Sequence, residues 1–160
     1  MRLALVPGSF DPMTLGHLDI VRRAAALFDR VVVAVLNNSE KEYTFTPEER
    51  VKIASLTVAE VPGTSVVYSD GYLVDLCRTL GACAVVKGLR TPADFGYEML
   101  EVEYNKAHMP ELETVFLPAS AGLEDCSSTE VRRLLKSGGD FSALVAPEAA
   151  EFIRRKIGRV

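Results

Sequence analysis

Cysteine, histidine and tryptophan are scarce in this chain, and their scarcity excludes several kinds of site. Its 160 residues include two histidines, three cysteines and no tryptophan. The cysteines, Cys77, Cys83 and Cys126, are odd in number and lack the CxxC spacing of zinc or redox sites. We therefore expect no disulfide framework and no metal held by the protein alone. Thiols that stay reduced predict a cytoplasmic protein.

Long apolar runs and an excess of positive charge are also missing. No run approaches the roughly 20 apolar residues that span a bilayer, and the start "MRLALVPGSF" holds too short an apolar stretch for a signal peptide. The formal net charge is −4, so no overall basic field favours nucleic acid. The C-terminal "RRKIGR" is short and is balanced by acidic residues elsewhere. We expect neither a membrane nor a nucleic acid as partner.

Strand-like and helix-like segments alternate along the whole chain. Strands are predicted at 2–7, 30–36, 64–69, 82–88 and 113–119, and helices at 15–28, 46–61, 72–81, 92–109, 127–139 and 147–158. The continuous apolar run "RVVVAVL" at 30–36 is typical of a strand covered on both faces. Such alternation predicts right-handed crossovers between parallel strands. The expected fold is α/β: a single doubly wound, Rossmann-like domain over residues 1–160, with a five-stranded parallel sheet and helices on both faces.

The segment after the first strand has the composition of an anion site. In doubly wound sheets the ligand lies beyond the carboxyl ends of the strands. Here "PGSFDPMTLGH" offers Gly8 for close backbone approach, the hydroxyl of Ser9, and His17 in the first turn of a helix. The segment contains neither GxGxxG nor a Walker loop. Taken alone, it also fits a simple Pro/Gly turn with an incidental histidine.

Three further strand ends carry compatible chemistry. Lys41 follows the second strand, Lys87 and Arg90 flank Gly88 after the fourth, and Ser127–Thr129 open a helix after the fifth. Each has a plain alternative, because loop lysines are usually solvated and hydroxyls usually cap helices. Four strand ends with anion-binding groups together favour a phosphate-bearing ligand.

Three motifs carry a resemblance to a known family. "PGSFDPMTLGH", "KGLRTPADFGYE" and "SSTEVR" resemble the nucleotidyltransferases with an (H/T)xGH motif. Thr14 at the first motif position and the "DFGYE" segment are similar to the bacterial phosphopantetheine adenylyltransferase branch, from Leu5 to at least Leu135. The resemblance implies transfer of the adenylyl group of ATP to 4′-phosphopantetheine in coenzyme A biosynthesis. It also implies Mg²⁺ bound with ATP, and a homohexamer.

The resemblance assigns roles to individual residues. His17 matches the residue that stabilises the transition state, and Lys41 and Arg90 are its expected catalytic companions. The expected ATP contacts are Ser9, Phe10, His17, Gly88, Leu89, Arg90, Glu98, Leu123, Glu124, Asp125, Cys126, Ser127, Ser128 and Thr129. The expected phosphopantetheine contacts are Ser9, Lys41, Leu73, Lys87 and Asn105.

Several positions depart from the common family pattern. Leu123 stands where many relatives have an aromatic residue, so a stacking contact with the nucleotide is in question. Glu124 and Asp125 add negative charge near an expected phosphate site. Lys87 replaces an arginine, which substitutes a point charge for a bidentate fork.

Two other functions stay open on the sequence alone. The first is the same chemistry with another acceptor, such as nicotinamide mononucleotide, or glycerol 3-phosphate with CTP. Thr14 and the "DFGYE" segment argue against it. The second is a non-catalytic nucleotide-binding module, and the presence of His17, Lys41 and Arg90 argues against that.

Overall fold

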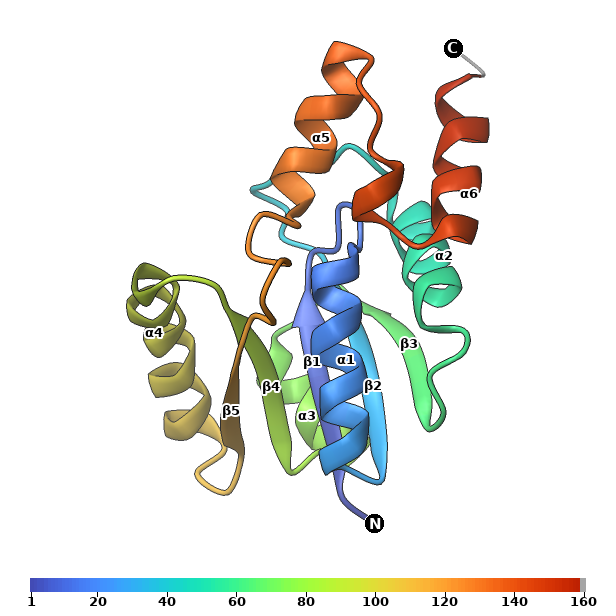
Figure 1. The fold of residues 1–160 in the computed structure, drawn as a ribbon. Helices are drawn as coiled ribbons and strands as arrows, with labels where there is room; N and C mark the ends of the chain where they lie inside the picture. Colours follow the sequence, from blue (N-terminus) through green and yellow to red (C-terminus); the bar gives the residue numbers. More distant parts are fainter. Residues whose placement is uncertain (159–160) are drawn as a thin grey trace.

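The computed structural model describes residues 1–158, in which five strands alternate with helices (Figure 1). The strands are β1 (Leu3–Gly8), β2 (Arg30–Leu36), β3 (Thr64–Ser69), β4 (Ala84–Leu89) and β5 (Glu113–Pro118). The helices are α1 (Leu15–Leu27), α2 (Pro47–Val58), α3 (Leu73–Leu80), α4 (Pro92–His108), α5 (Ser128–Ser137) and α6 (Pro147–Ile157), with a 3₁₀ turn at Ser142–Leu144.

The strands form one parallel sheet in the order β3-β2-β1-β4-β5. From β1 the chain winds outward through β2 to β3, then crosses back and winds outward again through β4 to β5. The predicted doubly wound α/β fold is confirmed. The switch point lies between β1 and β4, where the helices that follow the two strands diverge and leave a crevice at the carboxyl edge.

Both faces of the sheet are covered by helices. On one face α1, α2 and α6 enclose the larger core, to which β2 contributes Val31, Val33 and Val35. On the other face α3 and the chain just after α4 enclose a smaller core that holds Val32 and Ala34. Successive strand residues thus point to opposite cores, which is why the second strand is apolar without interruption.

Threonine residues define the start of three helices. Thr14, Thr46 and Thr91 each accept the backbone N–H of the third helical residue, whose own side chain accepts from the threonine N–H. The predicted cap of α2, with Pro47 and Glu49, is confirmed. The residue at the matching position of α1 is His17. This cap therefore fixes the histidine ring to the backbone of its own helix start.

Some predicted boundaries shift by a few residues. The helix expected over 46–61 ends at Val58, because the chain turns there and the N–H of Val61 donates to the Val58 carbonyl. The strand expected over 82–88 runs from Ala84 to Leu89, since Leu89 still pairs with Pro118 of β5. Lys87 and Gly88 therefore lie within β4, at the carboxyl edge of the sheet, and not after the strand as expected.

Helix α4 packs loosely on the rest of the chain. Asn105 is its one buried residue within the described part, whereas Phe95, Tyr97 and Leu100 are 46%, 75% and 67% exposed. Phe95 meets the Phe116 ring of β5 edge-on, whereas Tyr97 and Leu100, on one side of the helix, are left mostly uncovered by residues 1–158. None of the helices in those residues is both long and apolar enough to cross a membrane.

Candidate active site

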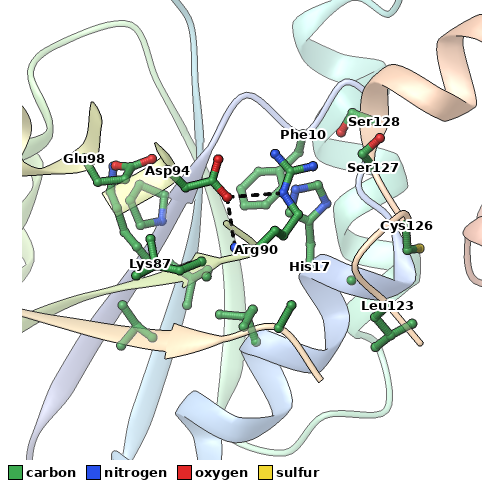
Figure 2. A pocket seen from close by; sticks show the side chains of 18 of the residues that line it. Phe10, His17, Lys87, Arg90, Asp94, Glu98, Leu123, Cys126, Ser127 and Ser128 are labelled. Atoms are coloured by element: carbon green, nitrogen blue, oxygen red, sulfur yellow. Dashed lines mark hydrogen bonds and ion pairs between the residues drawn. The ribbon is translucent and has the colours of Figure 1, made fainter. Parts of the chain in front are cut away.

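A cavity of about 300 Å³ lies at the switch point of the sheet (Figure 2). Its walls come from the ends of β1 and β4, the first turn of α1, the loop after β5 and the start of α5. The predicted residues that line it are Phe10, His17, Lys87, Gly88, Leu89, Arg90, Glu98, Leu123, Cys126, Ser127, Ser128 and Thr129. Most of the expected ATP contacts are therefore brought together in one place.

The hydrogen bonds of His17 fix the orientation and tautomer of its ring. The backbone N–H of Thr14 donates to His17 Nδ1 over 3.0 Å. The Thr14 hydroxyl also lies 3.0 Å from Nδ1, but it donates to the Cys126 carbonyl over 3.1 Å. Because Nδ1 acts as an acceptor, the proton of the neutral ring is on Nε2. His17 consequently presents an N–H donor on the side of the ring away from Thr14.

The ring of His17 is uncharged at neutral pH. Burial lowers the pKa of His17 from 6.5 to about 4, and the positive charge of Arg90 acts in the same direction. The Phe10 ring meets the imidazole edge-on, with ring centroids 5.1 Å apart, and contributes to its desolvation. A neutral donor stabilises developing negative charge without giving up its proton.

The two cations at the end of β4 have different surroundings. The ammonium of Lys87 lies 2.5 Å from a Glu98 oxygen and 2.6 Å from a Glu101 oxygen, so two carboxylates already neutralise it. Arg90 is half-exposed, and its Nε lies 3.7 Å from Asp94. In Figure 2 the guanidinium of Arg90 points toward His17 and Phe10. Arg90 is therefore the cation better placed to meet an anion beside the histidine.

The start of α5 forms the opposite wall and is fastened to the turn after β1. The Ser128 hydroxyl donates to the Pro12 carbonyl over 2.8 Å, and Arg132 Nη1 donates to the Asp11 carbonyl over 2.7 Å. Ser127 is the N-cap and accepts the N–H of Glu130. The N-terminal backbone N–H groups of α5 thus face the same cavity as the start of α1, and both helix ends favour an anion.

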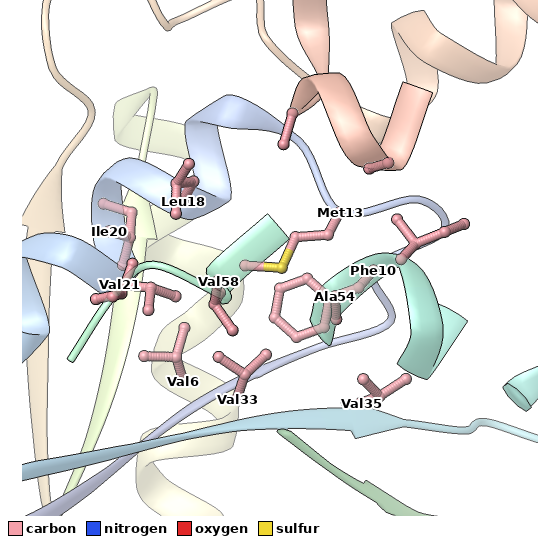
Figure 3. Packing of buried hydrophobic residues seen from close by; sticks show 14 of the residues in the cluster. Val6, Phe10, Met13, Leu18, Ile20, Val21, Val33, Val35, Ala54 and Val58 are labelled. Atoms are coloured by element: carbon pink, nitrogen blue, oxygen red, sulfur yellow. The ribbon is translucent and has the colours of Figure 1, made fainter. Parts of the chain in front are cut away.

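The turn between β1 and α1 is held in one backbone conformation by buried packing. Phe10 has a φ of +47°, a conformation that costs an L-residue about 1–2 kcal/mol. Its buried ring packs beside Met13, Val33 and Ala54 (Figure 3). A Cβ on Gly8 would lie 2.9 Å from that ring, so only glycine fits there. Packing holds the strained backbone in place, as is common at binding sites.

Comparisons with known proteins agree with this geometry. The profile of the Cytidylyltransferase-like family matches residues 5–134. The chain is 44% identical to a phosphopantetheine adenylyltransferase of Flavobacterium psychrophilum over 93% of this chain and 97% of that protein. It is 48% identical to the protein of that name from Nocardioides sp., over 92% of each chain. The chain belongs to the phosphopantetheine adenylyltransferase family.

A solved structure shows the same fold at lower sequence similarity. A putative nicotinate-nucleotide adenylyltransferase from Vibrio parahaemolyticus superposes with a TM-score of 0.74, covering 98% of this chain and 94% of the other. The two sequences are 16% identical, so this likeness concerns the fold alone. The motifs that carried the resemblance to phosphopantetheine adenylyltransferases all lie around the cavity.

Six predicted site residues do not line the cavity: Ser9, Lys41, Leu73, Asn105, Glu124 and Asp125. Ser9 is half-buried beside Phe10, and Lys41 is exposed in the loop after β2. Leu73 and Asn105 are both buried, with Leu73 packed in the smaller core. Glu124 and Asp125 are exposed, and Glu124 accepts the N–H of Gly122. The substrate contacts expected of these six residues stay predictions.

Two residues shape the phosphopantetheine adenylyltransferase site without having been predicted to do so. Thr14 holds His17 by its N–H and the loop after β5 by its hydroxyl. Gly16 lies against that loop, where an added Cβ would be 2.8 Å from the Cys126 carbonyl. The spacing Thr14-x-x-His17 is that of a capping box with histidine as its third helical residue. That spacing is the signal from which the role of Thr14 could be predicted.

Proposed function

We propose that this protein transfers the adenylyl group of ATP to 4′-phosphopantetheine, giving dephospho-coenzyme A and pyrophosphate. The near full-length similarity to proteins named phosphopantetheine adenylyltransferase supports this reaction. The geometric observation that carries the proposal is the hydrogen bond from the Thr14 N–H to His17 Nδ1. It leaves the Nε2–H of a neutral histidine free for an anion in a cavity between two helix N-termini.

The proposed chemistry is an in-line substitution at phosphorus. A phosphate oxygen of the acceptor forms a bond to the α-phosphorus of ATP, while the bond from that phosphorus to the bridging oxygen of pyrophosphate breaks. The acceptor phosphate has a second pKa near 6 and is largely dianionic at neutral pH, so no general base is needed. The protein contributes positioning and donors for the charge on the transferring group.

The ATP side of the proposed site is the cavity itself. Phe10, His17 and the strand end Gly88–Arg90 form one wall, and Leu123 with Cys126–Thr129 forms the other. We infer that the phosphates lie between the starts of α1 and α5, near Arg90. Apolar Leu123 provides a surface for the base in place of an aromatic ring.

The acceptor side is proposed along the edge of the same cavity. Ser9 and Lys41 come from the ends of β1 and β2, while Lys87 comes from the end of β4. Leu73 and Asn105 are the proposed contacts of the pantetheine arm. Because Glu98 and Glu101 hold the Lys87 ammonium, an incoming phosphate has to compete with both carboxylates for it.

Magnesium is proposed to arrive with the nucleotide. Among residues 1–158 no group of three or more histidine, cysteine, aspartate or glutamate side chains could hold a metal ion. Mg²⁺ characteristically binds at nucleotide sites through substrate phosphates, water and at most one or two carboxylates. The bound ion would reduce the negative charge of ATP, and no residue of this chain is assigned to it.

Self-association is proposed through α4, with a hexamer as the expected state. Tyr97 and Leu100 are three residues apart on one side of α4, and within residues 1–158 they stay 75% and 67% exposed. Sedimentation of the wild type and of a Leu100→Lys variant tests this proposal. We expect the variant to sediment as a smaller species. Identical masses would contradict the use of this face.

A cytoplasmic location is proposed from the state of the cysteines. Cys77, Cys83 and Cys126 are all free thiols, and Cys83 is exposed. Exposed free thiols are characteristic of proteins kept in a reducing compartment. Fractionation of cells with an antibody against this protein tests the location, and recovery outside the cytoplasm would contradict it.

Pyrophosphate release by the purified protein tests the proposed reaction. ATP and Mg²⁺ are supplied with 4′-phosphopantetheine, nicotinamide mononucleotide or no acceptor. We expect release only with 4′-phosphopantetheine, together with dephospho-coenzyme A identified by mass. Release with nicotinamide mononucleotide and not with 4′-phosphopantetheine would contradict the proposed acceptor. ATP binding without release in any mixture would favour a non-catalytic module.

A further inference from the structure

A fully buried arginine lies beside the proposed acceptor site, and no carboxylate of residues 1–158 pairs with it within 4.0 Å. Arg50 is in the first turn of α2, and its side chain is among the largest that are completely buried. Its Nη1 donates to the carbonyls of Ser9 and Leu36, each over 2.9 Å. Its Nη2 donates to Asn37 Oδ1 over 2.7 Å. One guanidinium therefore joins the carboxyl ends of β1 and β2.

The residues joined by Arg50 belong to the two segments expected to hold the acceptor phosphate. Ser9 is itself a proposed contact, and the loop that begins at Asn37 carries Lys41. The Tyr43 ring of the same loop lies under the guanidinium, with 3.9 Å between the guanidinium carbon and the ring centroid. Asp11 adds a second tie to this loop by accepting the N–H groups of Thr44 and Phe45.

The charge of Arg50 has no ion-pair partner within 4.0 Å among residues 1–158. Its Nε is buried and has no hydrogen-bond partner in the described part of the chain. An arginine keeps its charge when buried, and a buried charge without a partner is costly. Carbonyl dipoles and one aromatic ring offset only part of that cost, so an anion nearby would lower the energy further.

We propose that Arg50 is a positioning residue for the acceptor phosphate: it fixes the Ser9 turn and the Lys41 loop, and its buried charge favours the phosphate dianion. This inference rests on the proposed function. Arg50 does not line the cavity, so it acts through the two segments that it joins and through the electric field of its guanidinium charge. In this arrangement the free protein tolerates the isolated charge, and the acceptor supplies the missing negative charge on binding.

Calorimetric titration of 4′-phosphopantetheine and of ATP into the whole protein tests the inference. The variants are Arg50→Met, which removes the charge, and Arg50→Lys, which keeps the charge but loses the fork. Ile53→Val is the matched control, because it trims a fully buried side chain of the same helix that carries no charge. Melting temperatures are recorded for all four proteins.

We expect Arg50→Met to raise the Kd for 4′-phosphopantetheine about tenfold or more, in line with loss of a charge-assisted interaction. The Kd for ATP should rise clearly less, because Ser9 is an expected contact of both ligands whereas Lys41 is expected to contact the acceptor alone. Arg50→Lys should give a smaller increase for the acceptor alone, and it carries the test if the methionine variant does not fold. Ile53→Val should lower the melting temperature while leaving both Kd values unchanged.

Equal losses for both ligands, or unchanged acceptor affinity in both Arg50 variants, would overturn the inference and leave the proposed function intact. Failure of the wild type to bind 4′-phosphopantetheine would instead overturn the proposed acceptor, and with it the role of Arg50. The two failures are therefore separated by the wild-type titration.

Discussion

Acid should destabilise this protein through His17, and replacement of that residue should remove the effect. Burial, with a contribution from Arg90, lowers the pKa of His17 from 6.5 to about 4 in the folded chain. In the unfolded chain His17 has the ordinary histidine pKa of 6.5. Between these two values the unfolded state binds more protons than the folded state, so a fall in pH favours unfolding.

The size of the effect follows from the pKa difference. One pKa unit corresponds to 1.36 kcal/mol. For a shift from 6.5 to about 4, linkage gives a loss of about 2 kcal/mol at pH 5 and about 3 kcal/mol at pH 4. The stabilisation is fully present above pH 7 and is lost as the pH falls through this window.

Urea unfolding of the wild type and of His17→Gln, at pH 7, 6, 5 and 4, measures the difference. Glutamine does not titrate, and any hydrogen bond it loses to Thr14 shifts its stability equally at every pH. His108→Gln, which replaces the other histidine of the chain, controls for removal of a histidine as such. We expect the wild type to lose about 3 kcal/mol more than His17→Gln between pH 7 and pH 4. Parallel curves for the two proteins would refute the buried, neutral state of His17.

Three further substitutions test the packing and charge of the site. Glu101→Gln should lower the KM for 4′-phosphopantetheine, since it removes one of the two carboxylates that hold Lys87; an unchanged or higher KM would contradict this competition. Gly88→Ala should lower stability by about 1–3 kcal/mol, because its Cβ would lie 2.9 Å from Ile20, and Ile20→Ala should recover part of that loss in the double variant. Thr14→Val should cost about 1–3 kcal/mol in urea unfolding by leaving the buried Cys126 carbonyl unpaired, and a loss below 0.5 kcal/mol, roughly the level of a surface change, would contradict the hydrogen bond from the Thr14 hydroxyl to that carbonyl.

The fold follows from the sequence because its signals are local and repeated. Five apolar runs alternate with helical stripes, and Thr46, Pro47 and Glu49 mark a helix start by composition alone. The doubly wound order then places the ends of β1 and β4 next to each other. For the same reason His17, Arg90 and Ser127–Thr129 could be predicted to meet.

The rest of the site depends on contacts that composition does not encode. The pairing of Lys87 with Glu98 and Glu101 requires α4 to lie at a particular angle over β4, which no local pattern specifies. From the sequence alone, Arg50 is expected to be an ordinary solvent-exposed residue of a helix. Its burial follows only from the meeting of the two strand ends. Long-range packing of this kind appears only in the folded chain.

The most direct test of the central claim compares wild type with His17→Ala in single-turnover adenylyl transfer. ATP, Mg²⁺ and 4′-phosphopantetheine are supplied, and the Kd for ATP is measured separately. If the Nε2–H of His17 stabilises the transition state, the rate of transfer should fall by about two or more orders of magnitude while the Kd for ATP changes less than about tenfold. An unchanged rate of transfer with a weaker Kd for ATP would contradict the account.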